Sequence, residues 1–149
     1  MKQELKLRLL EPDAWGTLLS HPLLDLHDLS PVPMDTVYFD TADGALHRAG
    51  IAYCVRREGG RWIATVKGVG TSAGGLHQRP EWTVVVEEDK PFPQVFAGTE
   101  AGAMLFAAVA ENILLPLLET HFQRLKAGTE LGRWQRHPHS GRSRRNSRR

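Results

Sequence analysis

The chain is 149 residues long, and 41% of these residues are hydrophobic and 24% charged, a composition that excludes a wholly disordered chain and predicts a globular domain with its own core. No apolar run reaches the roughly 18 residues of a membrane span, so we expect no membrane partner and a cytoplasmic location. The single cysteine, Cys54, excludes an internal disulfide and a zinc site built from cysteines.

The formal net charge of +2 conceals a difference between two parts of the chain. Residues 133–149 contain seven arginines and no acidic residue, whereas the rest carries 12 basic and 17 acidic residues, a net charge of −5. We therefore place the domain at 1–130 and expect 131–149 to be a basic, disordered tail. Such a tail either stays solvated or binds nucleic acid or polyphosphate without specificity, and no specific nucleic-acid partner is expected.

The first predicted elements are a strand, a helix and a second strand. Alternating apolar and charged residues predict a strand over Lys2–Leu10, and Pro12 suits the first turn of a helix that runs to Ser20. The inner side of this helix is expected to carry Trp15, Leu18 and Leu19. The next strand is predicted at Asp35–Asp40.

A β-hairpin is predicted in the middle of the chain. Two alternating segments, Ile51–Glu58 and Arg61–Lys67, flank a Gly-Gly pair that can adopt the positive φ of a tight turn. The following segment, Gly68–Gly75, is expected to be flexible and glycine-rich and to form a hairpin or a lid-like loop. It lacks the Gly-Lys-Ser/Thr ending of a nucleotide P-loop and opens no helix. Alternation resumes at Arg79–Glu88, where a further strand is predicted.

A longer helix is predicted to cover the sheet, over Glu100–Leu118. Its apolar stripe consists of Met104, Leu105, Ala108, Ile113 and Leu117. A strand is expected at Thr120–Lys126, with Phe122 and Arg124 on one face. Beyond Gly128 no regular pattern remains.

Charged residues occupy one face of several predicted strands. Because successive side chains of a strand alternate, Glu4, Lys6 and Arg8 share the face opposite the intervening leucines. Similar pairs follow downstream: Arg56 with Glu58, Arg61 with Lys67, and Arg79 with Glu81. The pattern indicates either a sheet curled around a polar interior that holds a highly charged ligand or a sheet with one solvated face. A triphosphate needs several converging cations, and its hydrolysis needs carboxylates that hold a divalent metal.

Several motifs together resemble those of the CYTH domains, or triphosphate tunnel metalloenzymes, over residues 2–126. The opening strand corresponds to Glu-x-Glu-x-Lys in the family, and Tyr53-Cys54-Val55-Arg56 corresponds to Leu-Arg-x-Arg. The other two motifs are Tyr38-Phe39-Asp40-Thr41 with Leu46 and Gly50, and Trp62-x-x-Thr65-x-Lys67-Gly68. The run Gly74–Glu81 is similar to that of bacterial inorganic triphosphatases in particular. Thr120–Lys126 resembles the next family strand.

The resemblance implies an α+β fold, an antiparallel β-tunnel with flanking helices that is incomplete in this chain. It implies that the tunnel's basic residues bind a triphosphate, and by position these are Lys6, Arg8, Arg56, Lys67, Arg79 and Arg124. Its glutamates would bind Mg²⁺ or Mn²⁺, and the matching positions are Glu4 and Glu81.

Catalysis is accordingly assigned to Glu4, Glu81 and Lys67. The sequence is equally compatible with Glu81 serving only as an ion-pair partner. It is also equally compatible with Arg8 being a solvated charge at the end of the strand. The residues interpreted as scaffold are Tyr38, Asp40, Leu46, Trp62 and Thr65.

Two positions depart from the family pattern within the predicted tunnel. The opening strand has one glutamate where the family motif has two. If Lys6 matches the lysine of the motif, Lys2 stands in place of the first glutamate. If Arg8 matches that lysine, Lys6 stands in place of the second glutamate. Cys54 stands in place of the first arginine of Leu-Arg-x-Arg. Losing that charged contact costs roughly 1.5–3 kcal/mol, a factor of ten or more in binding.

The third departure is the segment after Thr129, where the family continues with strands that close the tunnel. Here an Arg/Ser-rich run follows instead. We expect the C-terminal part of the tunnel to be missing, with the tail translated from a shifted reading frame or a damaged gene. Reading the other frames past codon 130 tests this idea. An open tunnel exposes unpaired strand edges, so self-association is also predicted.

Three functions follow from these considerations. The first is metal-dependent hydrolysis of inorganic triphosphate (tripolyphosphate), weakened or lost in this chain. The second is a non-catalytic module that binds polyphosphate or nucleotides. The third is another chemistry of the family, thiamine triphosphate hydrolysis or adenylate cyclisation. The expected partners are inorganic triphosphate, polyphosphate or a nucleoside triphosphate.

Overall fold

The computed structural model describes residues 1–25 and 29–129. The chain divides into two units: residues 1–8 with 31–125, and residues 9–30 with 126–149. The first unit contains two sheets and their covering helices. The expected tail at 131–149, with its predicted origin in a shifted reading frame, lies outside the described residues.

The second unit contains, in its described part, one helix and one short strand pair. The helix α1 spans Ala14–Leu19, and β2 (Leu24–Asp25) pairs with β10 (Gly128–Thr129). The predicted helix is confirmed, but its predicted inner side is wrong because α1 has no buried residue and both Trp15 and Leu18 are exposed. A six-residue helix beside a two-residue strand pair has too little apolar surface to bury.

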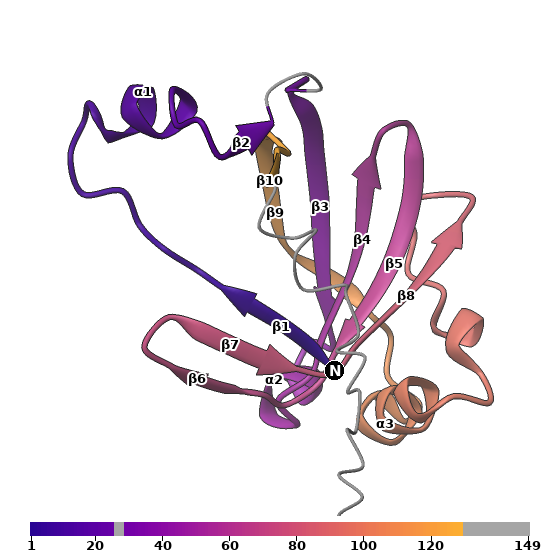
Figure 1. Cartoon of the computed structure of the whole chain (residues 1–149). Helices are drawn as coiled ribbons and strands as arrows, with labels where there is room; N and C mark the ends of the chain where they lie inside the picture. The colour runs from indigo at the N-terminus through magenta and orange to yellow at the C-terminus, as the bar shows by residue number, and fades with distance from the viewer. Residues whose placement is uncertain (26–28, 130–149) are drawn as a thin grey trace, which may run out of the picture. The chain divides into compact units, whose positions relative to one another are not determined.

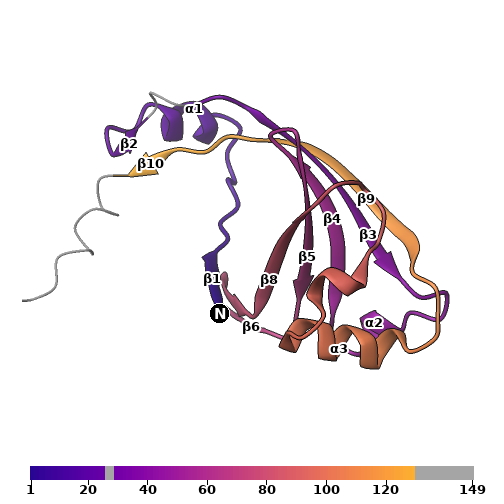
Figure 2. The same ribbon diagram turned by 90° about the vertical axis from the view of Figure 1, so that its right-hand side faces the viewer.

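The main sheet of the first unit has five antiparallel strands in the order β8-β5-β4-β3-β9 (Figures 1 and 2). Their bounds are β3 Val32–Asp40, β4 Ala52–Glu58, β5 Arg61–Lys67, β8 Glu81–Val86 and β9 Leu115–Arg124. The predicted hairpin of β4 and β5 is confirmed. Gly59 and Gly60 form its turn with φ of +57° and +81°, angles that glycine adopts without steric cost.

A small sheet, in the order β1-β7-β6, forms the other part of this unit. Its strands are β1 Lys2–Leu5, β7 Leu76–Arg79 and β6 Thr71–Ala73. The prediction of a strand up to Leu10 is wrong, because β1 pairs only with β7 and that partner has four residues. Of the two structures predicted for the glycine-rich segment, the hairpin is confirmed, because the segment contains β6, which pairs with β7.

Pro80 divides the strand predicted at 79–88 into two. Arg79 ends β7 in the small sheet, and Glu81 begins β8 in the main sheet. Proline has no N–H to donate to a strand ladder, although the Pro80 carbonyl still accepts a hydrogen bond from Gly68 N at 3.0 Å. The break places Arg79 and Glu81 at the junction of the two sheets.

Three helical segments provide the hydrophobic cover of the main sheet: α2 (Ala45–Arg48), the 3₁₀ helix η1 (Pro93–Phe96) and α3 (Glu100–Val109). Thr99 caps α3, and its hydroxyl accepts a hydrogen bond from Gly102 N at 3.1 Å. The buried core combines residues of the sheet and of these segments: Phe39, Leu46, Ile51, Tyr53, Val55, Ala64, Val66, Phe96, Ala101, Leu105, Val109 and Leu114.

The helix α3 is shorter than predicted. Met104, Leu105 and Ala108 face the core as expected, but the helix ends at Val109, and Ala110 has a positive φ of +50°. Ile113 and Leu117, predicted as part of the apolar stripe, are exposed. Pro116 cannot continue a helix interior, and the apolar run around it forms the start of β9 instead. The strand predicted at 120–126 is confirmed, with an earlier start.

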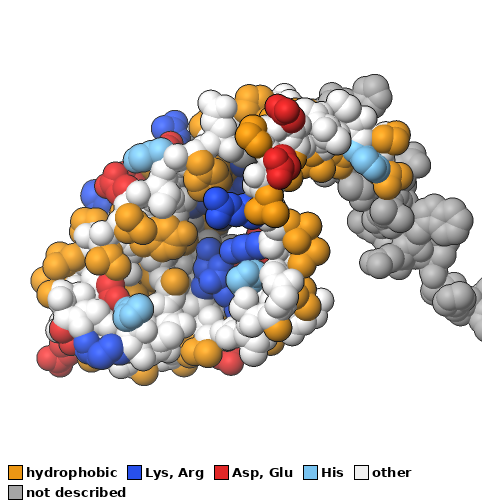
Figure 3. All heavy atoms as spheres, turned by 90° about the vertical axis from the view of Figure 1, so that its left-hand side faces the viewer, with side chains coloured by type: hydrophobic (Ala, Val, Ile, Leu, Met, Phe, Trp, Pro, Cys, Tyr) orange, Lys and Arg blue, Asp and Glu red, His pale blue; other side chains and the backbone are white. Residues whose placement is uncertain are grey.

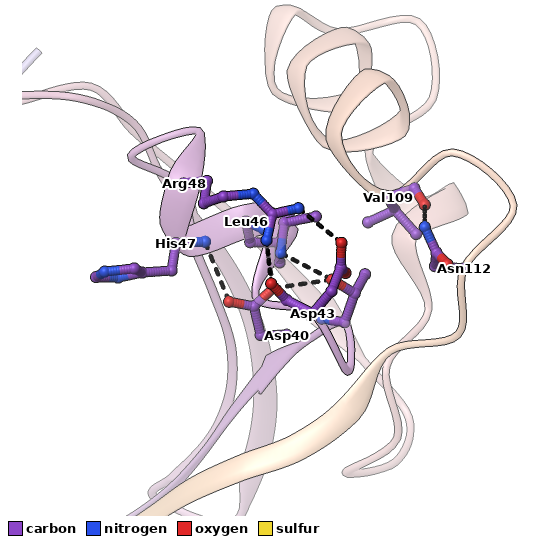
Figure 4. Close-up of polar contacts among 9 residues, drawn as sticks. Asp40, Asp43, Leu46, His47, Arg48, Val109 and Asn112 are labelled. Atoms are coloured by element: carbon purple, nitrogen blue, oxygen red, sulfur yellow. Dashed lines mark hydrogen bonds and ion pairs between the residues drawn. The ribbon is translucent and has the colours of Figure 1, made fainter.

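Hydrogen bonds to the Asp40 carboxylate connect the end of β3 to α2 (Figure 4). Its Oδ1 accepts hydrogen bonds from Thr41 N at 2.7 Å and Leu46 N at 2.8 Å, and its Oδ2 accepts one from His47 N at 3.1 Å. The bonds from Leu46 and His47 satisfy N–H groups of the first turn of α2, which the helix itself leaves unpaired. Asp40 thereby holds Leu46 in the core.

The predicted α+β class with antiparallel sheets and few helices is confirmed. Among the described residues the sheets do not close into a barrel, and β8 and β9 remain the edges of the main sheet. Within the same residues, no helix has both the length and the apolar character needed to cross a bilayer.

Candidate functional site

The face of the main sheet opposite the hydrophobic core is polar. Because side chains alternate along each strand, the residues between the core-facing positions point to this side. We call it the polar face, and its central residues are Thr36, Tyr38, Cys54, Arg56, Thr65, Lys67 and Glu81. Figure 3, drawn from the side opposite to Figure 2, shows Lys and Arg side chains gathered in a recess.

Strand register brings the central residues together. Cys54 lies directly opposite Tyr38 of β3 and Thr65 of β5, and Lys67 lies directly opposite Glu81 of β8. Residues paired in this way have Cβ atoms about 4.5–5.5 Å apart. The polar face is therefore built by backbone pairing of the central strands, which positions its side chains independently of any ligand.

Glu81 and Glu4 are connected through Lys2. The Lys2 ammonium lies 3.3 Å from Glu81 Oε2, 3.5 Å from Glu81 Oε1 and 3.8 Å from Glu4 Oε2. The Glu81 side chain is only 10% exposed, whereas that of Lys2 is half exposed. Two candidate metal-binding carboxylates therefore share one cation, which reaches them from the first strand of the chain.

Arg79 lies directly opposite Lys2 in the β1–β7 pair, at the junction of the two sheets. Burial lowers the pKa of Lys67, and the nearby positive charge of Arg79 lowers it further, against the opposing effects of Cys54 and Glu81. A lysine and an arginine close enough to repel each other form a site that favours an anion. The structure thus brings Lys67 and Arg79, which are both predicted to bind phosphate, close to each other.

Arg56 completes the cationic group from β4. Its guanidinium forms an ion pair with Glu58 at 3.0 Å, and both side chains are largely buried. Among the described residues, three buried polar atoms have no hydrogen-bond partner: Arg56 Nε, Thr65 Oγ1 and Glu81 Oε2, the last of which has only the ion pair with Lys2. Unpaired buried polar atoms are costly, so their concentration on one face indicates a place where a ligand or water completes the contacts.

Cys54 and Tyr38 lie within this group of charges. Burial raises the pKa of the Cys54 thiol, while Lys67 and Arg56 exert a smaller lowering effect. Burial likewise raises the pKa of the Tyr38 hydroxyl, and Arg79 and Arg56 are among the charges that act on it. Both groups are therefore neutral at physiological pH. Cys54 therefore supplies no positive charge to this group.

Three predicted site residues lie away from this group. Lys6 and Arg8 follow the end of β1, and both are exposed. Arg124 lies on the polar face but opposite Val32, at the far end of β3, with its guanidinium 5.7 Å from the centre of the Phe122 ring. Its position is about 13 Å along the strand from the row that contains Arg56.

The carboxylates of the site suit one mode of metal binding. No group of three or more His, Cys, Asp or Glu side chains in the described part of the chain could hold a metal by itself. Mg²⁺ is commonly held by one or two carboxylates together with substrate phosphates, and Glu4 and Glu81 fit that arrangement. Glu81 Oε2 is buried, lacks a hydrogen bond and contacts the Lys2 ammonium at 3.3 Å.

Sequence reasoning missed one residue of this site. The family pattern predicts for Lys2 only the place of a lost glutamate, yet its ammonium contacts both candidate metal ligands. The signal that points to it is the period of two, which puts Lys2 and Glu4 on the same face of β1. Its contact with Glu81 depends on the pairing of β1 with β7, which no local pattern encodes.

Comparison with known proteins gives a family match and a structural match. The model of the CYTH domain matches residues 2–131. A solved structure from Hippeastrum, described as that of a proposed adenylyl cyclase with a dominant triphosphatase activity, superposes with a TM-score of 0.59 at 20% sequence identity. The match covers 85% of this chain and 66% of that chain, so this chain spans slightly less than two thirds of its length.

Proposed function

The chain belongs to the CYTH domain family, and from this premise we propose that it binds a triphosphate on the polar face and hydrolyses its terminal phosphoanhydride bond, with inorganic triphosphate as substrate. The observation that carries the proposal is the group of half-buried cations Arg56, Lys67 and Arg79 on a face where buried polar atoms of Arg56, Thr65 and Glu81 lack hydrogen-bond partners. A highly charged anion is the ligand that such a group would stabilise best.

The basic residues would have different tasks. Arg56 and Arg79 each present a planar guanidinium that can donate two parallel hydrogen bonds to phosphate oxygens, and the unpartnered Nε of Arg56 is one such donor. Lys67 would act as a point charge between them. A bound anion would also relieve the repulsion between Lys67 and Arg79 that lowers the lysine's pKa.

Glu4 and Glu81 would hold a divalent cation, Mg²⁺ or Mn²⁺, in agreement with the metal dependence of triphosphate tunnel enzymes. The chemistry that such an ion supplies is Lewis acidity and neutralisation of charge at the terminal phosphoryl group. The protein's own residues would hold the chain of phosphates extended, so that water attacks the terminal phosphorus in line with the leaving oxygen. Arg56, Lys67 and Arg79 would stabilise the charge that develops on the leaving group.

The choice of inorganic triphosphate is supported by the segment Gly74–Glu81. Its resemblance to bacterial inorganic triphosphatases covers the residues that form the turn, β7 and the junction with β8. This segment supplies both Arg79 and Glu81 to the site. Thiamine triphosphate hydrolysis and adenylate cyclisation, the other chemistries of the family, would require contacts to an organic group in addition.

A second candidate is a module that binds triphosphate without hydrolysing it. It is favoured by two observations: Cys54 replaces a phosphate-binding arginine, and Lys2 occupies the space between the two candidate metal ligands. Such a protein would retain affinity for polyphosphate or nucleotides without turnover.

Phosphate release from tripolyphosphate with Mg²⁺ or Mn²⁺, measured beside binding under conditions without turnover, separates the two candidates. The enzyme is supported if wild type releases phosphate and Lys67→Ala does not, while Lys90→Ala, which removes a lysine paired with Glu88 away from the site, behaves as wild type. Binding without release supports the module. Thiamine triphosphate and ATP, tested in parallel, decide among the substrates of the family, and absence of both binding and release contradicts the proposal.

A further inference from the structure

Lys2 places a positive charge where a divalent cation would sit. Its ammonium contacts both oxygens of Glu81, at 3.3 and 3.5 Å, and one oxygen of Glu4, at 3.8 Å. The contact follows from two features of the fold: alternation puts Lys2 and Glu4 on one face of β1, and pairing with β7 puts Lys2 opposite Arg79, next to the start of β8.

We propose that Lys2 is a tethered counter-cation that competes with the divalent metal for Glu4 and Glu81. In the absence of metal its ammonium neutralises part of the carboxylate charge, and a metal ion must displace it to bind. Lys2 therefore sets a weak metal affinity and allows triphosphate to bind without metal. This inference rests on the proposed function for the identity of the anion and for the assignment of Glu4 and Glu81 as metal ligands.

The electrostatics explain why a cation is needed at this place. The Glu81 side chain is 10% exposed, and a carboxylate buried to that extent without a partner is strongly destabilising. A triphosphate bound beside Glu4 and Glu81 would add further negative charge. Without Lys2 or a metal, the carboxylates would repel the ligand that Arg56, Lys67 and Arg79 attract.

The same geometry allows the ammonium to leave. The Lys2 side chain is half exposed, and lysine carries its charge on a flexible four-carbon stem. Rotation of this stem would move the ammonium into solvent without a change in the pairing of β1 and β7. Competition between lysine and metal thus requires a side-chain movement only.

Titration of Mn²⁺ in the absence of any phosphate, followed by the electron paramagnetic resonance of the free ion, tests the proposal directly. We expect Lys2→Gln to bind Mn²⁺ about tenfold more tightly than wild type, and Lys2→Glu, which supplies a third carboxylate, to bind more tightly still. Lys2→Arg keeps the charge and should keep the weak binding. Lys90→Gln removes a lysine that pairs with Glu88 at 2.9 Å outside the site, and it should leave Mn²⁺ binding unchanged.

The proposal is overturned if Lys2→Gln binds Mn²⁺ as weakly as wild type, or if Lys90→Gln strengthens binding as much as Lys2→Gln does, since the effect would then reflect net charge alone. Thermal melting of each variant shows whether it is folded. Lys2→Glu and Lys2→Gln change the side chain in different ways. If one of these variants fails to fold, the Mn²⁺ binding of the other still tests the proposal.

Calorimetric titration of tripolyphosphate in EDTA provides a second readout. Wild type should bind, Lys2→Gln should bind about tenfold more weakly, and added Mn²⁺ should restore the binding of Lys2→Gln. Equal binding by both proteins in EDTA contradicts the role of Lys2 as counter-cation. If wild type binds no tripolyphosphate under any condition, the proposed function fails, whereas the Mn²⁺ titration without phosphate still decides the role of Lys2.

Discussion

Lys67 of β5 and Glu81 of β8 lie directly opposite each other on the polar face, so that the central cation of the site and a candidate metal ligand are fixed by one strand pair. The pKa of Lys67 is lowered, first by burial and then by Arg79, against the effects of Cys54 and Glu81. The environment of Lys67 thus disfavours the charged form of its side chain. Such an environment is expected for a residue that serves ligand binding rather than stability.

Lys67→Met is therefore expected to stabilise the protein when no anion is present. The folded-state pKa of Lys67 lies below its ordinary value of 10.5, so the unfolded chain binds more protons between these two values and stability rises with pH across that window. At neutral pH the charged form costs stability, and its removal should raise the melting temperature by a few degrees. The same change should abolish the increase in melting temperature that tripolyphosphate causes in wild type. A lower melting temperature without anion would show that Lys67 has a structural role.

Cys54→Arg is expected to strengthen tripolyphosphate binding about tenfold, because a guanidinium at this position adds a charged contact worth roughly 1.5–3 kcal/mol. Without ligand the new charge repels the neighbouring cations, so the variant should melt at a lower temperature than wild type. Tripolyphosphate should then raise the melting temperature of the variant by more than it raises that of wild type. Cys54→Ser, which adds no charge, is the matched control. Unchanged or weaker binding by a folded Cys54→Arg protein would show that this position does not face the phosphate chain.

Asp40→Ala should destabilise the first unit by about 3 kcal/mol, since a buried carboxylate that accepts three backbone hydrogen bonds is lost. Urea denaturation followed by tryptophan fluorescence measures the change. Asp43→Asn provides a control in the same segment, where an exposed aspartate pairs with Arg48, and its effect should be much smaller. Similar losses in both variants would contradict the anchoring role of Asp40.

His121 should make a small contribution to stability that depends on pH. A hydrogen bond with Asp35 is the largest cause that raises its pKa above 6.5 in the folded protein. The contribution is therefore fully present below pH 6.5 and is lost as pH rises through the folded-state pKa. The difference in melting temperature between wild type and Asp35→Asn should favour wild type at acidic pH and shrink with rising pH. A difference that grows with pH would disprove this sign.

The outer edge of β9 should support self-association. Among the described residues no strand pairs with this edge, and Leu115, Leu117 and Leu118 of β9 are exposed. We expect wild type to associate in sedimentation velocity experiments at micromolar concentration and Leu117→Lys to reduce that association. Leu7→Lys changes an equally exposed leucine outside the strands and should leave it unaltered. Equal association of the two variants would place the contact elsewhere.

The elements predicted correctly from the sequence are those in which one local pattern decides. The hairpin of β4 and β5 combines a period of two with a Gly-Gly turn, and no other structure suits that combination. The predicted end of the helix at Leu118 is wrong because the apolar run at 113–118 suits a helix and a strand equally well. Pro116 was the available signal that favoured the strand.

The candidate site was predictable only in part for a similar reason. Alternation predicts which residues of a strand share a face, and the family resemblance selects Arg56, Lys67 and Glu81 among them. Which faces meet depends on pairing between distant strands, and for this reason neither the Lys2–Glu81 contact nor the distance of Arg124 from the main group could be predicted. The early end of β1, which leaves Lys6 and Arg8 exposed, likewise depends on the length of its partner strand.

Phosphate release from tripolyphosphate by wild type and Arg79→Ala in the presence of Mn²⁺ decides whether the polar face is a triphosphate site. Arg79 is placed to hold the phosphate chain, so wild type should release phosphate and the variant should lose most of that activity while melting as wild type does. Equal release by both proteins, or neither binding nor release by wild type, would contradict the assignment of a triphosphate site to the polar face.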